Sequence, residues 1–307
     1  MRTLVTGGAG FIGSNLVDAL VRRGDDVTVL DDLSTGRAEN LAGSAARLVE
    51  TSITGDLGPV FETARPEIVF HLAAQVDVRR SVEDPAADLA INGSGTLRVL
   101  EAARAAGARH VVYASTGGAI YGDTDEIPTP ESAPIAPLAP YGHSKHVGEG
   151  YCRLFAQLHG LGATSVRFAN VYGPRQDPLG EGGVVAIFCG RVLDGAPATI
   201  FGTGEQTRDF VYVGDVVAAL LAASDGGARF GPYNIGTGRE TSVNDLAGVL
   251  RKVSGRDFAP DHRPSRPGEV ERSCLNPARA HEELGWRAGT ALEDGLRETL
   301  AWAAGRA

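Results

Sequence analysis

TLVTGGAGFIGS, residues 3–14, is the stretch that decides the fold of this chain. An apolar run typical of a strand leads into three glycines, and an amphipathic run over residues 11–20 leads out of them. Gly7 permits a tight turn from strand to helix, Gly10 lets a pyrophosphate approach the backbone, and Gly13 lets the helix pack closely on the strand. Free N–H groups at the start of the helix favour an anion there. The G-x-x-G-x-x-G spacing therefore predicts a dinucleotide-binding turn.

Two acidic residues follow the next strand-like run, residues 27–30. An acid at the tip of the second strand can accept hydrogen bonds from the hydroxyls of an adenosine ribose, and it would repel a 2′-phosphate. Asp31 and Asp32 therefore favour NAD over NADP, although both could be turn residues only. Arg37 lies a few residues further on and could weaken that preference.

The bulk composition is that of an ordinary globular enzyme. The chain has 307 residues, of which 43% are hydrophobic and 22% are charged, and this is enough to bury a sizeable core. A net charge of -9 argues against nucleic acid as a main partner. Cys152, Cys189 and Cys274 are too scattered to suggest a disulfide framework or a metal site. We expect a cytoplasmic protein, because neither a signal peptide nor a membrane span is evident.

Strand-like and helix-like runs alternate through the first half of the chain. This order predicts an α/β fold with a doubly wound parallel Rossmann sheet and a smaller C-terminal lobe. We expect residues 1–168 to bind NAD, with a return to this unit at about residues 211–237, and residues 169–307 to form mainly the substrate lobe. The expected strands are residues 3–6, 27–30, 47–49, 68–72, 110–114 and 164–168; the expected helices are 11–23, 57–65, 88–106 and 141–158.

Beyond residue 168 the pattern is less regular. Residues 170–183 are rich in glycine, proline and charge, and they read as a loop that could cover a ligand. Helices are expected at residues 184–193, 215–223, 241–253 and 292–304, and short strands near 198–201 and 210–212.

Tyr141 and Lys145 form the candidate catalytic pair. Four residues apart at the start of a helix, they share one face. A tyrosine ordinarily ionises near pH 10, and a nearby ammonium favours the phenolate and lowers its pKa. Tyr141 could then exchange a proton with a substrate hydroxyl while hydride moves to the nicotinamide. Only two of the 29 basic residues are lysines, so the retention of Lys145 points to a task that arginine cannot perform.

A strand upstream ends in two hydroxyl residues, Ser115 and Thr116. Either could bond the reacting oxygen and steady the proton transfer, or both could simply stabilise the following turn.

The sequence resembles the extended short-chain dehydrogenase/reductase superfamily, in its NAD-dependent epimerase/dehydratase branch, and within it the UDP-galactose (UDP-glucose) 4-epimerases. The resemblance covers nearly the whole chain. The matching segments are TGGAGFIGS at 6–14, HLAAQVDVRRS at 71–81, AIYGD at 119–123, YGHSK at 141–145, RFANVYGPRQ at 167–176, GEGGVVAIF at 180–188, FGTGEQTRDFVYVGDVV at 201–217 and RPGE at 266–269.

The resemblance implies a role for each matching position. Tyr141 would be the catalytic acid/base and Lys145 would hold the nicotinamide ribose, with Ser115 or Thr116 beside them. NAD would lie against Gly7, Gly10, Phe11, Ile12, Gly13, Asp31, Asp32, Ser52, Ile53, Leu72, Ala73, Ala74, Asn92, Tyr141 and Lys145. The nucleotide sugar would lie against Gln75, Asn170, Val184, Arg208, Arg266, Glu269 and Ser273. In such enzymes the position that matches Ser273 borders the sugar's 2-substituent, and the small serine would admit N-acetyl sugars.

The chain departs from the family pattern at three places. Gly117 stands where many epimerases carry the catalytic hydroxyl, so Thr116 or Ser115 must serve. Ser52 stands where an acid often binds adenine, and Gln75-Val76 replaces a lysine found in some members.

The same stretch discriminates between reactions. Family dehydratases and decarboxylases carry acids after the strand hydroxyl, whereas this chain has Gly117-Gly118. The resemblance therefore implies 4-epimerisation of a UDP-sugar by transient oxidation at C4. A net nucleotide-sugar dehydrogenase or reductase, another sugar epimerase and a non-catalytic NAD-sensing protein remain alternatives. Family members commonly form homodimers through the helices expected here at 88–106 and 141–158.

Overall fold

The computed structural model describes residues 1–178, 183–225, 231–258, 260–265 and 270–305. In these residues the largest sheet has seven strands, all parallel, in the order β11-β6-β5-β4-β1-β2-β3. Its strands are β1 (Arg2–Thr6), β2 (Asp26–Asp31), β3 (Arg47–Glu50), β4 (Ile68–His71), β5 (His110–Thr116), β6 (Gly162–Phe168) and β11 (Pro232–Ile235). The doubly wound Rossmann prediction is confirmed, with the strand order reversing between β1 and β4.

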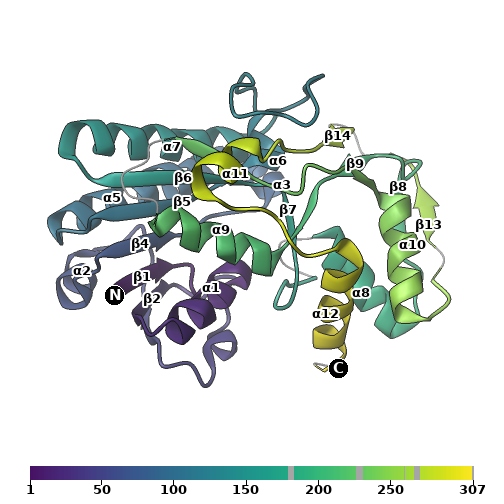
Figure 1. Cartoon of the computed structure of the whole chain (residues 1–307), viewed down its shortest axis with the longest axis horizontal. Coiled ribbons are helices and arrows are strands. Elements are labelled where there is room, and N and C mark those ends of the chain that lie inside the picture. The colour runs from purple at the N-terminus through teal and green to yellow at the C-terminus, as the bar shows by residue number, and fades with distance from the viewer. Residues whose placement is uncertain (179–182, 226–230, 259, 266–269, 306–307) are drawn as a thin grey trace.

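Helices cover both faces of this sheet (Figure 1). On one face, α1 (Phe11–Arg22) and α9 (Val213–Asp225) share a core with alternate strand residues such as Val112. On the other face, α2 (Gly58–Ala64), α5 (Thr96–Ala105) and α7 (Pro140–His159) share a second core with Val111 and Tyr113. This alternation follows from the two-residue period of a strand and places α7 directly over β5.

The helix expected at 88–106 begins earlier and is not uniform. Asp84 accepts a hydrogen bond from Ala87 N and starts α4 (Pro85–Leu89). A π-helical stretch, η2 (Ala90–Gly95), then leads into α5. Wide turns of this kind are frequent at functional sites, and this one contains Asn92. The pattern also missed α3 (Val78–Glu83), whose N-terminus Asp77 caps through Arg79 N and Arg80 N.

The C-terminal lobe is built from short strands and three longer helices. Its core joins α8 (Val184–Asp194), α10 (Val243–Ser254) and α12 (Leu292–Ala304). The short elements not yet named, taken along the whole described chain, are η1 (Ala38–Leu41), α6 (Gly117–Ile120), β7 (Asn170–Tyr172), β8 (Thr199–Phe201), β9 (Thr207–Arg208), β10 (Phe210–Tyr212), β12 (Thr241–Ser242), β13 (Asp261–Arg263), β14 (Arg272–Ser273) and α11 (Ala278–Leu284). Figure 1 shows α8, α10 and α12 standing beside the end of the main sheet.

Six of the described strands lie where none was expected: β7, β9, β11, β12, β13 and β14. β7 forms at the start of the presumed loop 170–183 and pairs with β10. β11, with the four-residue sequence PYNI, is too short for a pattern of alternating residues to identify it, and it pairs with β6.

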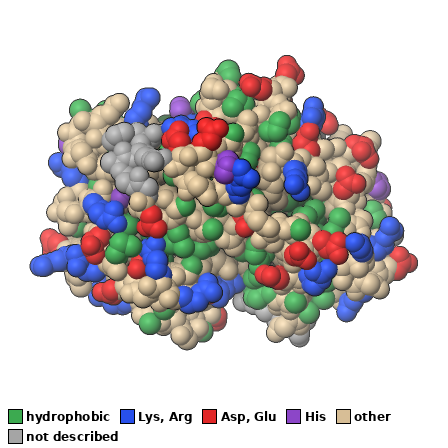
Figure 2. Space-filling view, in the orientation of Figure 1, with side chains coloured by type: hydrophobic (Ala, Val, Ile, Leu, Met, Phe, Trp, Pro, Cys, Tyr) green, Lys and Arg blue, Asp and Glu red, His purple; other side chains and the backbone are tan. Residues whose placement is uncertain are grey.

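Basic and acidic side chains are interspersed over the face of the molecule in Figure 2. In the described residues, the helices lack the combination of length and apolarity that crossing a membrane requires.

Candidate functional site

The glycine-rich turn fits the dinucleotide prediction in detail. Gly7 has φ +69, and a Cβ on it would stand 2.7 Å from Ala73 N. A Cβ on Gly13 would stand 2.0 Å from the Gly7 carbonyl oxygen, so the turn itself requires this glycine. Gly10 is the N-cap residue of α1 and, as a glycine, has no side chain that could accept a hydrogen bond from the helix. The first N–H groups of a helix have no partner within it, which suits the anion that the sequence analysis expects here.

Asp31 braces this turn. Its Oδ2 accepts a hydrogen bond from Ala9 N and its Oδ1 accepts one from Leu33 N, each at 2.9 Å. Burial raises the pKa of Asp31 despite these two bonds. A carboxylate can accept about four hydrogen bonds, so the capacity to bind a ribose hydroxyl remains.

Asp32 and Ser52 lie at the tips of β2 and β3. Partial burial opposes ionisation of Asp32, but hydrogen bonds from Ser34 and Ser52 hold its pKa below the usual value. The structure thus brings Ser52, expected near adenine, next to Asp32. Ile53 is buried. A Cβ on Gly95 would stand 2.8 Å from Ile53 Cδ1, so this glycine lets η2 lie close to this end of the sheet.

The loop after β4 is held by a buried amide network. Gln75 N donates to Asn92 Oδ1 and Asn92 Nδ2 donates to Gln75 O, both at 2.9 Å. Gln75 Nε2 donates to Asp88 Oδ1 at 2.8 Å, and Asn92 Nδ2 also reaches Ser144 Oγ at 3.1 Å. Both amides are therefore committed to joining the loop, η2 and α7, although Gln75 is expected at the substrate.

The backbone beside the glycine turn continues this loop. Leu72 N donates to Thr6 O at 3.1 Å and Ala73 N to Thr6 Oγ1 at 3.2 Å. Ala74 follows directly and is partly exposed. These residues lie where NAD is expected to pass from β1 toward β4.

Tyr141 and Lys145 lie on the first turns of α7. Pro140 occupies a favourable first position of this helix, and Tyr141 N donates to Ser81 Oγ of α3 at 3.1 Å. Tyr141 is half-buried, whereas Lys145 is only 3% exposed. Lys145 Nζ stands 4.6 Å from the centroid of the Tyr113 ring. Burial lowers the pKa of Lys145 to about 8, opposed by the negative charges of Glu149 and Asp88.

The two strand-end hydroxyls are both buried but differ in place. Successive strand residues point to opposite faces, so Ser115 shares the α7 face with Tyr113, whose OH donates to Lys145 O at 3.3 Å. Ser115 lies opposite Arg167 in the register of β5 and β6. Thr116 is the last residue of β5 and the N-cap of α6.

A buried ion pair lies beneath this end of the sheet and was not expected. Arg167 Nε and Nη2 donate to the two Glu149 carboxylate oxygens at 2.8 and 2.6 Å, and Arg167 Nη1 donates to Tyr121 OH at 2.7 Å. Burial alone would raise the pKa of Glu149, but the bonds from Arg167 lower it to about 2. Glu149 on α7 and Arg167 on β6 are 18 residues apart, so no spacing within one helix could have signalled the pair.

Apart from Gln75, the expected substrate residues come from the C-terminal lobe. The side chain of Asn170, on β7, lies near Gly118, since a Cβ there would be 3.8 Å from Asn170 Oδ1. Arg208 on β9 and Ser273 on β14 are direct neighbours in register. Val184 begins α8. Arg266 and Glu269 lie outside the described residues.

Asp209 is a further buried residue that the sequence analysis missed. Its Oδ1 accepts bonds from Thr237 N and Oγ1 at 2.8 and 2.6 Å, and its Oδ2 accepts from Gly238 N at 3.2 Å and Leu275 N at 3.3 Å. Asp209, which directly follows Arg208, thereby links its own segment to residues 237–238 and to Leu275, two residues after Ser273. An acid between Arg208 and Phe210 was the only local signal.

Two cavities differ in their relation to these residues. A cavity of about 310 Å³ is bordered by Gln206, two residues before Arg208, and by Glu271, which directly precedes Arg272. It is completed by Phe201, Gly202, Thr203, Arg263, Pro264, Ser265 and Val270.

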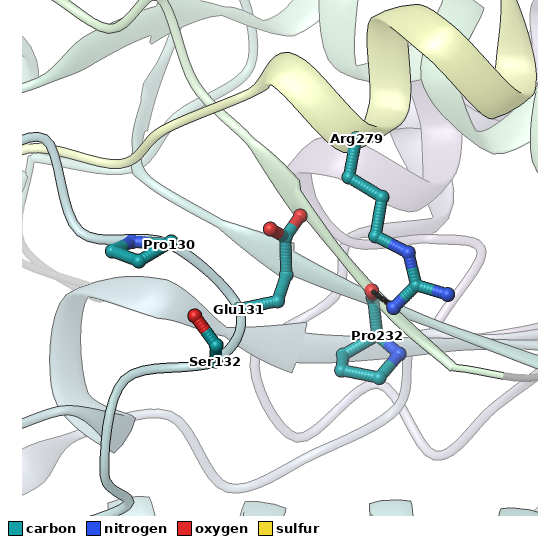
Figure 3. A pocket seen from close by; sticks show the side chains of 5 residues that line it. All are labelled: Pro130, Glu131, Ser132, Pro232 and Arg279. Atoms are coloured by element: carbon teal, nitrogen blue, oxygen red, sulfur yellow. Dashed lines mark hydrogen bonds between the residues drawn. The ribbon is translucent and has the colours of Figure 1, made fainter.

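The other cavity, of about 390 Å³, lies at the outer edge of β11 (Figure 3). Here Glu131 Oε1 accepts from Asn234 N at 2.8 Å, and Arg279 Nη1 donates to Pro232 O at 3.1 Å. Glu131 and Arg279 thus form hydrogen bonds with backbone groups of the edge strand β11. In the described part of the chain, none of the expected site residues lines this cavity.

Comparison with known proteins agrees with this geometry. The model of the NAD dependent epimerase/dehydratase family matches residues 3–236. A UDP-glucose 4-epimerase of Mycolicibacterium smegmatis is 46% identical over 312 residues, covering 98% of this chain and 97% of that protein. The crystal structure of a Thermotoga maritima UDP-glucose 4-epimerase with UDP-glucose has a TM-score of 0.96 and 47% identity, over 100% of this chain and 99% of that one. A Thermus thermophilus UDP-glucose 4-epimerase in complex with NAD has a TM-score of 0.93 and 42% identity over the whole of both chains. The chain belongs to the NAD dependent epimerase/dehydratase family.

Proposed function

We propose that the chain is a UDP-glucose 4-epimerase that works with NAD. The observation that carries the proposal is the placement of Tyr141 and the buried Lys145 on the first turns of α7, at the end of the sheet where the glycine turn also lies. Full-length similarity to proteins named UDP-glucose 4-epimerase supports it.

NAD, when bound, would accept and return the hydride at C4 of the sugar. The fit rests on the uncapped N-terminus of α1, on the close approach of Gly7 to Ala73, and on the spare acceptor capacity of Asp31. The turn would hold the pyrophosphate, Asp31 and Asp32 the adenosine ribose, and Lys145 the nicotinamide ribose.

Tyr141 would be the residue that exchanges a proton with the sugar. As a phenolate it would take the proton of the sugar 4-hydroxyl, and as a phenol it would return one to the inverted product. The Lys145 ammonium, held away from water, favours the phenolate. At neutral pH Lys145 keeps its charge despite burial, because its pKa is about 8.

Thr116 is the better candidate for the hydroxyl beside Tyr141. Ser115 lies in register with Arg167, whose partner Glu149 is eight residues, about two helical turns, beyond Tyr141. Ser115 on β5 therefore faces α7 near Glu149, about two turns beyond Tyr141, while Thr116 ends the strand.

The nucleotide sugar would be held from the C-terminal lobe. Arg208 and Arg266 would bind the diphosphate, because an arginine fork matches phosphate oxygens, and Asn170 would assist them. Anchored there, the sugar could turn and present either face of C4 to the same residues. Ser273, adjacent to Arg208, would border its 2-substituent.

This assignment implies a division of labour between two units. Residues 1–168, with residues from about 211–237, would form the NAD-binding unit, and residues 169–307 would mainly hold the nucleotide sugar. The contribution of β11 to the main sheet supports the return of the chain to the first unit.

We also propose a homodimer. Large exposed apolar side chains lie on α3, α4 and α7, where Val82, Leu89, Leu154 and Leu158 are 62, 48, 42 and 66% exposed. Burying this surface against a second copy would remove it from water.

Incubation with a panel of UDP-sugars, with products resolved by NMR, tests the function. We expect interconversion of UDP-glucose and UDP-galactose without net NADH. Stoichiometric NADH would instead identify a dehydrogenase, and a complete lack of turnover would favour an NAD-sensing protein.

A further inference from the structure

We propose that Asp177 is a determinant of cofactor specificity: by pairing with Arg37 it keeps that guanidinium from binding the 2′-phosphate of NADP. The inference rests on the proposed NAD-dependent function and extends it to a residue of the segment that follows β7. Asp177 would thus add to the preference for NAD over NADP that Asp31 is expected to give.

Arg37 is tied to the dinucleotide turn by its own backbone. Arg37 N donates to Ala9 O at 3.0 Å, and Ala9 N in turn donates to Asp31 Oδ2 at 2.9 Å. Asn40 Nδ2 donates to the same Ala9 oxygen at 2.9 Å. The arginine therefore belongs to the wall that carries the proposed ribose-binding acid, the place from which an arginine can accommodate a 2′-phosphate.

The Arg37 side chain is engaged from the other side. Its Nη2 donates to Asp177 Oδ2, and the side chains are 48 and 28% exposed. A guanidinium bound to a carboxylate offers less charge and fewer N–H groups to a phosphate, and the carboxylate itself repels that phosphate.

Asp177 is held in place by its neighbours rather than by this ion pair alone. Asn15 Nδ2 bridges Phe11 O at 2.9 Å and Pro174 O at 3.1 Å. Arg175, in the left-handed region at φ +75, donates through Nη2 to Asp18 Oδ2 of α1 at 2.6 Å. These contacts dock the segment 173–177 on α1, so that Asp177 meets Arg37 at a fixed place beside the turn.

Asp177→Asn removes the carboxylate and releases Arg37. NAD and NADP would be titrated by calorimetry into protein freed of bound dinucleotide, for wild type, Asp177→Asn, Arg37→Gln and the double variant. We expect Asp177→Asn to tighten NADP binding about fivefold, the scale of one partly exposed ion pair, with NAD affinity nearly unchanged. In the double variant this gain should vanish, because it requires the released arginine.

Two further variants separate the pair from general charge effects. Glu39→Gln removes the same charge from an exposed residue two positions after Arg37 and outside the docked segment 173–177, and it should leave the NADP-to-NAD ratio at its wild-type value. Asp177→Glu keeps a partner for Arg37 and should do likewise.

An unchanged ratio in Asp177→Asn would overturn the inference, as would a gain that persists in the double variant or appears equally in Glu39→Gln. If wild type binds NAD, those results leave the proposed function intact. If wild type binds neither dinucleotide, both the inference and the proposed function fail.

Discussion

The side chain of Leu275 lies directly over Gly117: a Cβ at position 117 would stand 2.3 Å from Leu275 Cδ1. Leu275 follows β14 and is 1% exposed, and its backbone is fixed by Asp209 and by a bridge to Thr129. The segment from the C-terminal lobe thus fills the place beside the end of β5 that any side chain at 117 would need. This contact explains why a glycine stands where the family resemblance expects a hydroxyl.

Gly117→Ala should therefore lower the free energy of unfolding by about 1–3 kcal/mol through overpacking. In a Leu275→Ala background the same substitution should cost little, because the opposing methyl groups are gone. Urea unfolding of the four proteins measures the coupling. Gly118→Ala is the matched control, since the nearest atom to its Cβ is 3.8 Å away. Equal costs of Gly117→Ala in both backgrounds would contradict this contact.

Tyr141→Phe should keep the fold and NAD binding and reduce epimerisation by about 10²–10⁴-fold, the usual contribution of a positioned acid/base. Turnover of UDP-galactose and the dinucleotide content of the purified variant are the two measurements. Near-native turnover with NAD retained would remove Tyr141 from the mechanism.

The two strand-end hydroxyls should separate by mutation. We expect Thr116→Val to lower kcat for UDP-galactose by about tenfold or more, as loss of a hydrogen bond made in the transition state would. Ser115→Ala should reduce kcat far less, because Ser115 lies at the depth of Arg167. The reverse order would assign the role to Ser115.

Substrate width should depend on Ser273. The small side chain next to Arg208 predicts that N-acetyl UDP-sugars are accepted, and Ser273→Tyr should exclude them at a cost of about 1–3 kcal/mol in transition-state binding. The ratio of kcat/KM for UDP-galactose and UDP-GalNAc gives the answer, with Ser273→Ala as the size-matched control. If the ratio is the same in wild type and the tyrosine variant, another wall limits the pocket.

The stability of the protein should fall in mild acid through His71. Burial lowers the pKa of this imidazole to about 3, and its ring nitrogens bond Thr6 Oγ1 at 2.7 Å and Thr96 Oγ1 at 2.9 Å. Below the ordinary pKa of about 6.5 the unfolded chain binds a proton that the folded chain does not, so stability decreases as pH falls.

Between about pH 6 and pH 4, wild type should lose up to about 1.4 kcal/mol per pH unit more than His71→Gln. Urea unfolding at each pH measures the difference, and other titrating groups, such as His110, are common to both proteins. Parallel curves for the two proteins would show that His71 is not the acid-sensitive group.

The parts that sequence reasoning predicted are those with local causes. Strands β1 to β6 have apolar runs, and the turn between β1 and α1 has glycines at positions that φ +69 at Gly7 and the crowding at Gly13 require. Helix α7, which contains Tyr141 and Lys145, was expected to begin at residue 141 and begins at Pro140.

The parts that were missed depend on distant partners. η2 is held by the bonds of Asn92 to Gln75 and Ser144, and β11 by its pairing with β6. The role of Asp209 requires Thr237 and Leu275, and Arg37 acquires its partner from residue 177. Periodicity and spacing within a short window carry none of this information.

The position of β11 also bears on how the molecule comes apart. The chain leaves the main sheet after β6, builds much of the second lobe and then returns to lay β11 along the free side of β6. Peeling the second lobe away would strip the partner from β6 and expose a row of backbone donors and acceptors. Loss of tertiary structure in the two lobes should therefore coincide in a single cooperative transition, and a fragment ending at residue 168 should aggregate through its bare strand edge rather than fold alone.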